Sequence, residues 1–278
     1  MSVRTDLAVE ENMNLEGIET KEKEIGEIRV SKTVISSDET AKKINKPCGK
    51  YITVSFPDIE KITDYKQLEE SILISLKSFV DGSTDSLLVV GLGNREITAD
   101  SIGPKTAERI LATRHIAGEF AEKIGLKGLK SVAVISPNVL GNTGIEAVEI
   151  IKGAVDKIKP RLVIVIDACV SRGIDRIFRT IQISNTGISP GSGVKNSRKE
   201  ISESTLKTKV ISIGIPTVVD AMVLAEELSD KAALRQTDLV LTPKDCDLYT
   251  HRMSEILARS LNKFLQPEIS EEILFSLV

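Results

Sequence analysis

The sequence predicts an α/β fold with a doubly wound, mostly parallel mixed sheet flanked by helices. Short, continuous apolar runs such as 87–90 and 162–166 are typical of strands that are buried on both faces of a parallel sheet. Stretches with apolar residues at helical spacing separate these runs. With 278 residues, 41% of them hydrophobic and 28% charged, the chain is long enough for one substantial core.

The N-terminal part reads differently from the rest. Residues 1 to about 48 are polar and rich in Glu and Lys, and we expect an arm with little core of its own. Residues 51–56 alternate like a strand, which Pro57 ends. A helix should begin near Thr63 or Asp64, because either residue could cap it and apolar residues then recur at helical spacing.

From residue 87 onward, strands and helices alternate, which is typical of a doubly wound sheet. The expected strands are 87–90, 132–135, 162–166, 180–183, 210–213 and 239–241. The expected helices open near Pro104, run over 143–158, pass through Met222 and Leu224, and run from about Asp245 to Phe264.

Two aspartates follow strands of this predicted sheet. Asp100 comes after strand 87–90 and the glycine turn 91–94, and Asp167 directly follows strand 162–166. Because ligands bind outside the carboxyl ends of parallel strands, we expect both carboxylates at one crevice. Two neighbouring carboxylates can share one proton, an arrangement that suits peptide-bond hydrolysis.

Each aspartate also has a structural interpretation. Asp100 could cap the helix that opens near Pro104, and Asp167 could pair with Arg172. A carboxylate that closes a buried strand is costly unless it is paired or solvated, so we favour a cleft for Asp167. The glycine turn does not complete a dinucleotide-binding G-x-G-x-x-G motif, because its third glycine is replaced by Glu96.

Two further loops carry candidate binding residues. Residues 184–193 are small and turn-forming, and their backbone N–H groups could bind a phosphate, an oxyanion or an extended peptide. The same run could be merely a flexible surface loop. Residues 142–144 could form another loop at a strand end or cap the next helix. The candidate binding residues in the glycine turn and these loops are Gly93, Asn94, Thr143, Gly144, Ser184, Thr186, Gly187, Gly191 and Gly193.

Composition excludes several classes of function. A net charge of −3 and a pI near 5.7 give no electrostatic case for direct nucleic-acid binding. No apolar stretch approaches the roughly 20 residues of a membrane-spanning helix, and the polar N-terminus lacks the apolar core of a signal peptide. We therefore expect no membrane association and a cytoplasmic location.

The cysteines suggest neither a disulfide framework nor a zinc site. Cys48, Cys169 and Cys246 are odd in number and widely spaced. Cys169, two residues after Asp167, could be a nucleophile only with a histidine partner, and only His115 and His251 exist. We expect buried, unreactive thiols rather than a Cys/His enzyme.

Collinear motifs spread over nearly the whole chain carry a family resemblance. They are SVRTDLAVE at 2–10, GLGN at 91–94, DSIGP at 100–104, GNTGIE at 141–146, VIDA at 165–168, IQISNTGI at 181–188, PGSGV at 190–194, RKE at 198–200 and GIPTVVD at 214–220. Together they resemble the germination protease family, endopeptidases of spore-forming bacteria that degrade small acid-soluble spore proteins.

The resemblance implies a single phosphorylase/hydrolase-like domain, similar to hydrogenase maturation endopeptidases. It implies an atypical aspartic mechanism with Asp100 and Asp167 as catalytic residues, no metal or other cofactor, and a homotetramer in the forespore and spore core. It also implies a self-processing zymogen. Family cleavage sites have an acidic residue, then a hydrophobic one, then Ala. The cut is thus expected between Asp6 and Leu7, with residues 1–6 as propeptide and 7–278 as the peptidase domain.

Two other functions remain open from the sequence. One is a metal-assisted maturation-type peptidase with ligands near Glu96 and Asp100. The other is a non-catalytic protein of the same fold whose glycine-rich loop binds a phosphorylated ligand. Which aspartate acts as base and which as acid is also left open.

Overall fold

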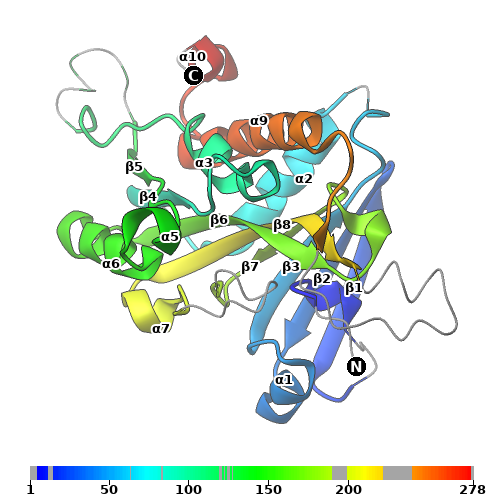
Figure 1. Ribbon diagram of the computed structural model, residues 1–278. Helices are drawn as coiled ribbons and strands as arrows, with labels where there is room; N and C mark the ends of the chain where they lie inside the picture. The colour runs from blue at the N-terminus through cyan, green and yellow to red at the C-terminus, as the bar shows by residue number, and fades with distance from the viewer. Residues whose placement is uncertain are drawn as a thin grey trace, which may run out of the picture.

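Strands at the centre of the computed structural model are parallel, and those on one flank are antiparallel (Figure 1). The structure describes residues 5–11, 15–62, 64–82, 84–118, 121, 123, 126, 128–189, 199–221 and 240–276. The strands are β1 Ile18–Ile25, β2 Ile28–Ile35, β3 Gly49–Ser55, β4 Ser86–Gly91, β5 Ser131–Ile135, β6 Leu162–Ser171, β7 Thr180–Ser184, β8 Lys209–Asp220 and β9 Val240–Leu241.

These strands form one mixed sheet in the order β1-β2-β3-β7-β8-β6-β4-β5, with β9 paired to β8. Neighbours from β8 to β5 are parallel, and those from β1 to β8 are antiparallel. The helices are α1 Asp38–Ile44, α2 Lys66–Lys77, α3 Ile102–Ala107, α5 Leu140–Thr143, α6 Ala147–Ile158, α7 Glu203–Leu206, α9 Cys246–Leu265 and α10 Glu271–Ser276. Short 3₁₀ turns in the described residues are η1 Ala8–Glu10, η2 Thr98–Asp100 and η3 Ile174–Arg176.

Helices cover both faces of the parallel strands, as Figure 1 shows with α2, α3 and α9 on one side and α6 on the other. Successive residues of a strand point to opposite faces. Leu87 and Val89 of β4 accordingly pack in the cluster that contains α2 and α9, whereas Leu88 and Val90 pack with α6. Burial on both faces explains the continuous apolar runs, and the predicted α/β class with a mixed sheet is confirmed.

The expectation of an arm with little core over the first 48 residues is wrong. Strands β1 and β2 form a hairpin that extends the sheet through β3. A small cluster of Ala8, Ile35, Ile44 and Tyr51 packs beside it. The sequence of β1, IETKEKEI, conceals the strand because its inner residues are all exposed and polar.

One predicted helix start is confirmed and one needs correction. Helix α2 spans Lys66–Lys77, Tyr65 before it already has helical dihedral angles (φ −76°, ψ −5°), and Asp64 caps the helix by accepting the Lys66 N–H at 2.9 Å. Residue 63 lies outside the described part of the chain. The helix expected from 143 begins at Ala147, because Gly144 takes a left-handed conformation (φ 69°) that ends α5.

Other elements match their predicted places, although β6 and β8 run further than expected. The helix expected through Met222 and Leu224 lies outside the described residues. Within the part of the chain that the structure describes, no helix is both long enough and apolar enough to cross a bilayer.

Candidate active site

Asp100 lies in η2, directly after the turn that follows β4. Its Oδ2 accepts the backbone N–H of Asn94 at 2.7 Å, so the carboxylate points back toward the glycine turn. The N-cap position of α3 belongs to Ser101. The alternative role of Asp100 as helix cap is therefore wrong.

Gly93 makes this arrangement sterically possible. Its φ of 113° is a conformation that side-chain-bearing residues rarely adopt. A Cβ built on Gly93 would lie 1.9 Å from the carbonyl oxygen of Asp100 and 3.1 Å from its Oδ1. The glycine turn thus brings Asp100 against the end of β4. This close approach explains why residue 93 is glycine, without a phosphate ligand.

Asp167 lies inside β6, because the strand continues to Ser171 instead of ending at residue 166 as predicted. The residue is 6% exposed and pairs with Gly214 of the neighbouring parallel strand β8. Arg172 is its predicted salt-bridge partner. The Arg172 guanidinium contacts the N-terminal segment, residues 5–11, at the Glu10 carbonyl (2.8 Å) and the Glu11 carboxylate (3.4 Å).

The two aspartates lie at one cavity of about 610 Å³. Asp100 and Asp167 both line it, as expected from strands that end at one edge of the sheet. Thr5 and Asp6 of the N-terminal segment line the same cavity. The predicted dyad and the predicted cleavage site therefore share one space.

The candidate binding residues divide into three groups. Those that line the cavity are Gly93, Ser184, Thr186 and Gly187. Asn94, Thr143 and Gly144 are not among its described lining residues; Asn94 instead bonds Asp100, and the Thr143 hydroxyl bonds the Ile145 backbone. Gly191 and Gly193 lie outside the described residues.

Sequence reasoning missed polar residues of the cavity wall that lie within strands. Ser212 of β8 hydrogen-bonds Ser184 of β7 through their hydroxyls at 2.8 Å, and Thr186 continues the chain at 3.0 Å. Gln182 of β7 also lines the cavity. The only sequence signal for Gln182 is the alternation of polar and apolar residues in β7, which is equally typical of a solvent-facing strand. Ser212 lies in a nearly continuous apolar run and carries no such signal.

The N-terminal segment is held along the end of β6. The Asp6 N–H donates to the Val170 carbonyl at 2.9 Å, and the Val170 N–H donates to Asp6 Oδ2 at 2.9 Å. Lys46 Nζ donates to the Thr5 carbonyl at 2.6 Å. Leu7 is fully buried. The peptide bond between Asp6 and Leu7 is thus fixed on both sides.

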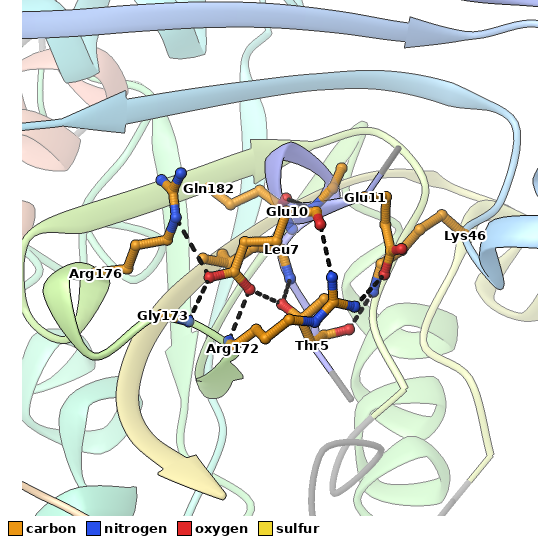
Figure 2. A network of polar contacts seen from close by, with 10 residues as sticks. Thr5, Leu7, Glu10, Glu11, Lys46, Arg172, Gly173, Arg176 and Gln182 are labelled. Carbon is orange, nitrogen blue, oxygen red and sulfur yellow. Dashed lines mark hydrogen bonds and ion pairs between the residues drawn. The ribbon is translucent and has the colours of Figure 1, made fainter. Parts of the chain in front are cut away.

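Glu10 anchors the same segment further along (Figure 2). Its carboxylate accepts the backbone N–H groups of Arg172 at 2.7 Å and Gly173 at 2.8 Å, pairs with Arg176 at 3.3 Å and accepts the Thr5 hydroxyl. Charge-assisted bonds of this kind are about twice as strong as neutral ones. The turn η1 is therefore docked firmly on the loop after β6.

Cys169 also lines the cavity, but its environment disfavours a thiolate nucleophile. Burial raises the pKa of the Cys169 thiol well above its ordinary value, and the carboxylates of Asp6 and Asp167 raise it further. His251 lies on α9, where its ring contacts Arg109 at 3.2 Å. Neither His251 nor His115 is among the described residues of the cavity wall.

The donor set offers little for a metal. Among the residues that the structure describes, no three His, Cys, Asp or Glu side chains are grouped as metal ligands would be. Glu96, a ligand required by the metal-assisted alternative, is exposed and its N–H bonds the Asn94 side chain at 3.0 Å.

Comparison with known proteins identifies the family. The family model described as germination protease matches residues 1–232. The germination protease of Clostridium tetani is 41% identical, with 98% of each chain covered, and that of Caldanaerobacter subterraneus is 37% identical, with 98% of this chain and 97% of the relative covered. That of a Geobacillus species is 43% identical over 82% of this chain and 67% of its own.

One solved structure, a [NiFe] hydrogenase maturation protease from Thermococcus kodakarensis, aligns with a TM-score of 0.39 at 16% identity, covering 67% of this chain and 98% of its own. The family match and the near-complete coverage of the curated relatives are the decisive findings. The chain therefore belongs to the germination protease family and is an endopeptidase of spore germination.

Proposed function

We propose that this chain is made as a zymogen that cuts itself between Asp6 and Leu7, and that the processed enzyme starts the degradation of small acid-soluble spore proteins. Asp100 and Asp167 form the catalytic dyad. The observation that carries the proposal is the single cavity lined by both aspartates and by Asp6. Thr5 and Asp6 of the N-terminal segment form part of the wall of this cavity, so the segment borders the site before it is cut, which would account for an inactive precursor.

The chemistry needs one carboxylate and one carboxylic acid. Two carboxyl groups in one partly dry cavity ionise in turn, so one can retain a proton while the other is charged. The charged aspartate removes a proton from water as the water oxygen bonds to the Asp6 carbonyl carbon. The protonated aspartate stabilises the carbonyl oxygen and then gives its proton to the Leu7 nitrogen as the C–N bond breaks.

The bound segment also explains the substrate preference that we propose. The Val170 N–H receives an acidic side chain before the cut, and a dry site receives Leu7 after it. Ala8, next in sequence, is 1% exposed, so a larger residue would meet the packed cluster around Ile35 and Tyr51. A segment of acidic, apolar and Ala residues in a spore protein would fit the same positions.

Assembly as a homotetramer in the cytoplasm of the forespore and spore core belongs to the same proposal. Its support is the similarity to germination proteases over nearly the full chain. The aspartate dyad needs no metal, so a chelator should leave cleavage unchanged, whereas a metal-assisted peptidase would lose it.

Intact-mass analysis of the purified precursor tests the proposal. Wild type, Asp100→Asn, Asp167→Asn and the control Asp156→Asn, an exposed residue of α6, are incubated alone and with a small acid-soluble spore protein. We expect wild type and Asp156→Asn to lose residues 1–6 and to cleave the substrate after acidic residues. The two dyad variants should remain intact. Self-cleavage by folded Asp167→Asn at the wild-type rate would refute the dyad.

A further inference from the structure

Gln182 occupies a special place in the sheet. It lies in the middle of β7, where it pairs with Gly214 of β8, and Gly214 pairs on its other side with Asp167 of β6. Residues paired in this way project to the same face of a sheet. Gly214 contributes no side chain between Asp167 and Gln182, and all three residues line the cavity.

The side-chain amide of Gln182 forms hydrogen bonds with the N-terminal segment at two backbone positions. Its Oε1 accepts the N–H of Ala8 at 2.6 Å, and its Nε2 donates to the carbonyl oxygen of Asp6 at 3.1 Å. A backbone N–H can only donate and a carbonyl can only accept, so these partners determine which end of the amide is which.

The two bonds lie on either side of Leu7 and thus span the predicted scissile bond. The Asp6 carbonyl is the group that water would attack, and negative charge would develop on its oxygen. An N–H donor at about 3 Å from that oxygen is the arrangement by which proteases stabilise an oxyanion. The bond to Ala8 sets which carbonyl of the segment reaches Nε2.

We propose that Gln182 is a further catalytic residue of the reaction, which fixes the register of the substrate backbone and stabilises the oxyanion beside the aspartate dyad. The inference rests on the proposed cut between Asp6 and Leu7. Because both contacts involve backbone atoms, Gln182 would bind any substrate in the same way, whatever its side chains. The bond to Gln182 Oε1 requires that the second residue of the substrate after the cut has a backbone N–H, as Ala8 does.

The first test measures the first-order rate of self-cleavage in the full-length precursor by intact mass. Gln182→Met keeps the size of the side chain without its hydrogen bonds and should lower the rate by about 10² to 10³-fold, the usual effect of removing one oxyanion donor. Gln67→Met, a change of the same kind on the exposed face of α2, should leave the rate unchanged. Thermal unfolding of each variant establishes that it is folded.

Gln182→Glu separates a chemical role from a structural one. An ionised carboxylate accepts the Ala8 N–H but repels the Asp6 carbonyl, whereas a protonated one can donate to it. The rate of Gln182→Glu relative to wild type should therefore rise as the pH falls through about 4.3, the ordinary pKa of glutamate. The relative rate of Gln182→Met should stay flat over the same range.

Ala8→Pro removes the other partner and does not depend on the packing of β7. Leu7 is extended (φ −84°, ψ 125°) and Ala8 opens η1, so proline suits the backbone here. Its ring adds bulk beside Ile35 and Tyr51, so thermal unfolding must first establish that the variant is folded. We expect at least a tenfold slower cut, and little further loss when the change is added to Gln182→Met.

The outcomes distinguish the two proposals. If wild type cuts after Asp6, Asp167→Asn does not, and folded Gln182→Met cuts at the wild-type rate, the role of Gln182 is refuted and the dyad stands. If wild type leaves the bond between Asp6 and Leu7 intact under all conditions, both proposals fall. Slow cutting by Gln182→Met with acid rescue of Gln182→Glu supports the role of Gln182.

Discussion

Gly93 and Asp100 are in backbone contact, and a single methyl group on Gly93 would lie 1.9 Å from the Asp100 carbonyl oxygen. The six residues between them also return the Asp100 carboxylate to the Asn94 N–H. Because Gly93 has no side chain, the backbone of Asp100 can approach it, and this approach positions one carboxylate of the proposed dyad.

Gly93→Ala should slow self-cleavage by about 100-fold while leaving the protein folded. The substitution forces Asp100 to move, and a displacement of about 1 Å can cost about 100-fold in rate. Gly82→Ala is the matched control, because Gly82 also has a positive φ (85°) but nothing within 4 Å of the added Cβ. Intact mass and thermal unfolding should show slower cleavage in the first variant only.

Asp6→Ala should slow the cut after residue 6 by about 10- to 100-fold. The substitution removes the acceptor of the Val170 N–H, and a hydrogen bond to a charged group contributes about 1.5 to 3 kcal/mol. Asp6→Asn keeps an acceptor oxygen, so its cleavage rate should fall between those of wild type and Asp6→Ala. Wild-type rates for Asp6→Ala, measured beside Asp156→Ala, would contradict a recognition role for this carboxylate.

Cys169→Ala should cut itself at close to the wild-type rate. Burial and two nearby carboxylates raise the pKa of the thiol, so Cys169 is protonated at neutral pH. In native protein near pH 8, an alkylating reagent should modify the exposed Cys48 and spare Cys169. Loss of cleavage in folded Cys169→Ala would instead revive a cysteine mechanism.

Tyr51 should make the protein less stable at high pH. Burial raises the pKa of Tyr51 to about 12, and its hydroxyl donates to the Pro47 carbonyl at 2.7 Å. The unfolded chain loses this proton near pH 10, so the stabilisation is complete below pH 10 and disappears as the pH rises to about 12. It amounts to about 2 to 3 kcal/mol.

Denaturant unfolding at several pH values checks this prediction. The free energy of unfolding of wild type should fall more steeply above pH 10 than that of Tyr51→Phe, which lacks the ionisable group. Parallel curves for the two proteins would contradict it.

The sequence predicted the centre of the molecule better than its edges. Buried parallel strands such as β4 and β6 can be recognised by their uninterrupted apolar runs. Asp167 can be recognised as a candidate site residue because it interrupts such a run. The six inner residues of β1 are all exposed and polar, so the strand carries no hydrophobic period that could be recognised.

Gln182 could not be identified from sequence for a different reason. A polar residue in an alternating strand normally faces solvent, and only the register of three strands reveals that Gln182 and Asp167 share a row. Strand register depends on contacts between residues far apart in the chain, which local patterns do not encode. The docking of Glu10 beside Gly173 is likewise a contact across 163 positions.

The anchoring of η1 has a consequence for the time course of activation. Hydrolysis after Asp6 would release only the residues before the cut, while Leu7 stays buried and Glu10 stays bound to Gly173 and Arg176. The new ammonium group would then form inside a cavity lined by two carboxyl groups, where opposite charge holds it. The freshly processed enzyme would thus be occupied by its own N-terminus as a tethered product inhibitor. Activity toward other proteins should lag behind cleavage by the time that this end needs to leave.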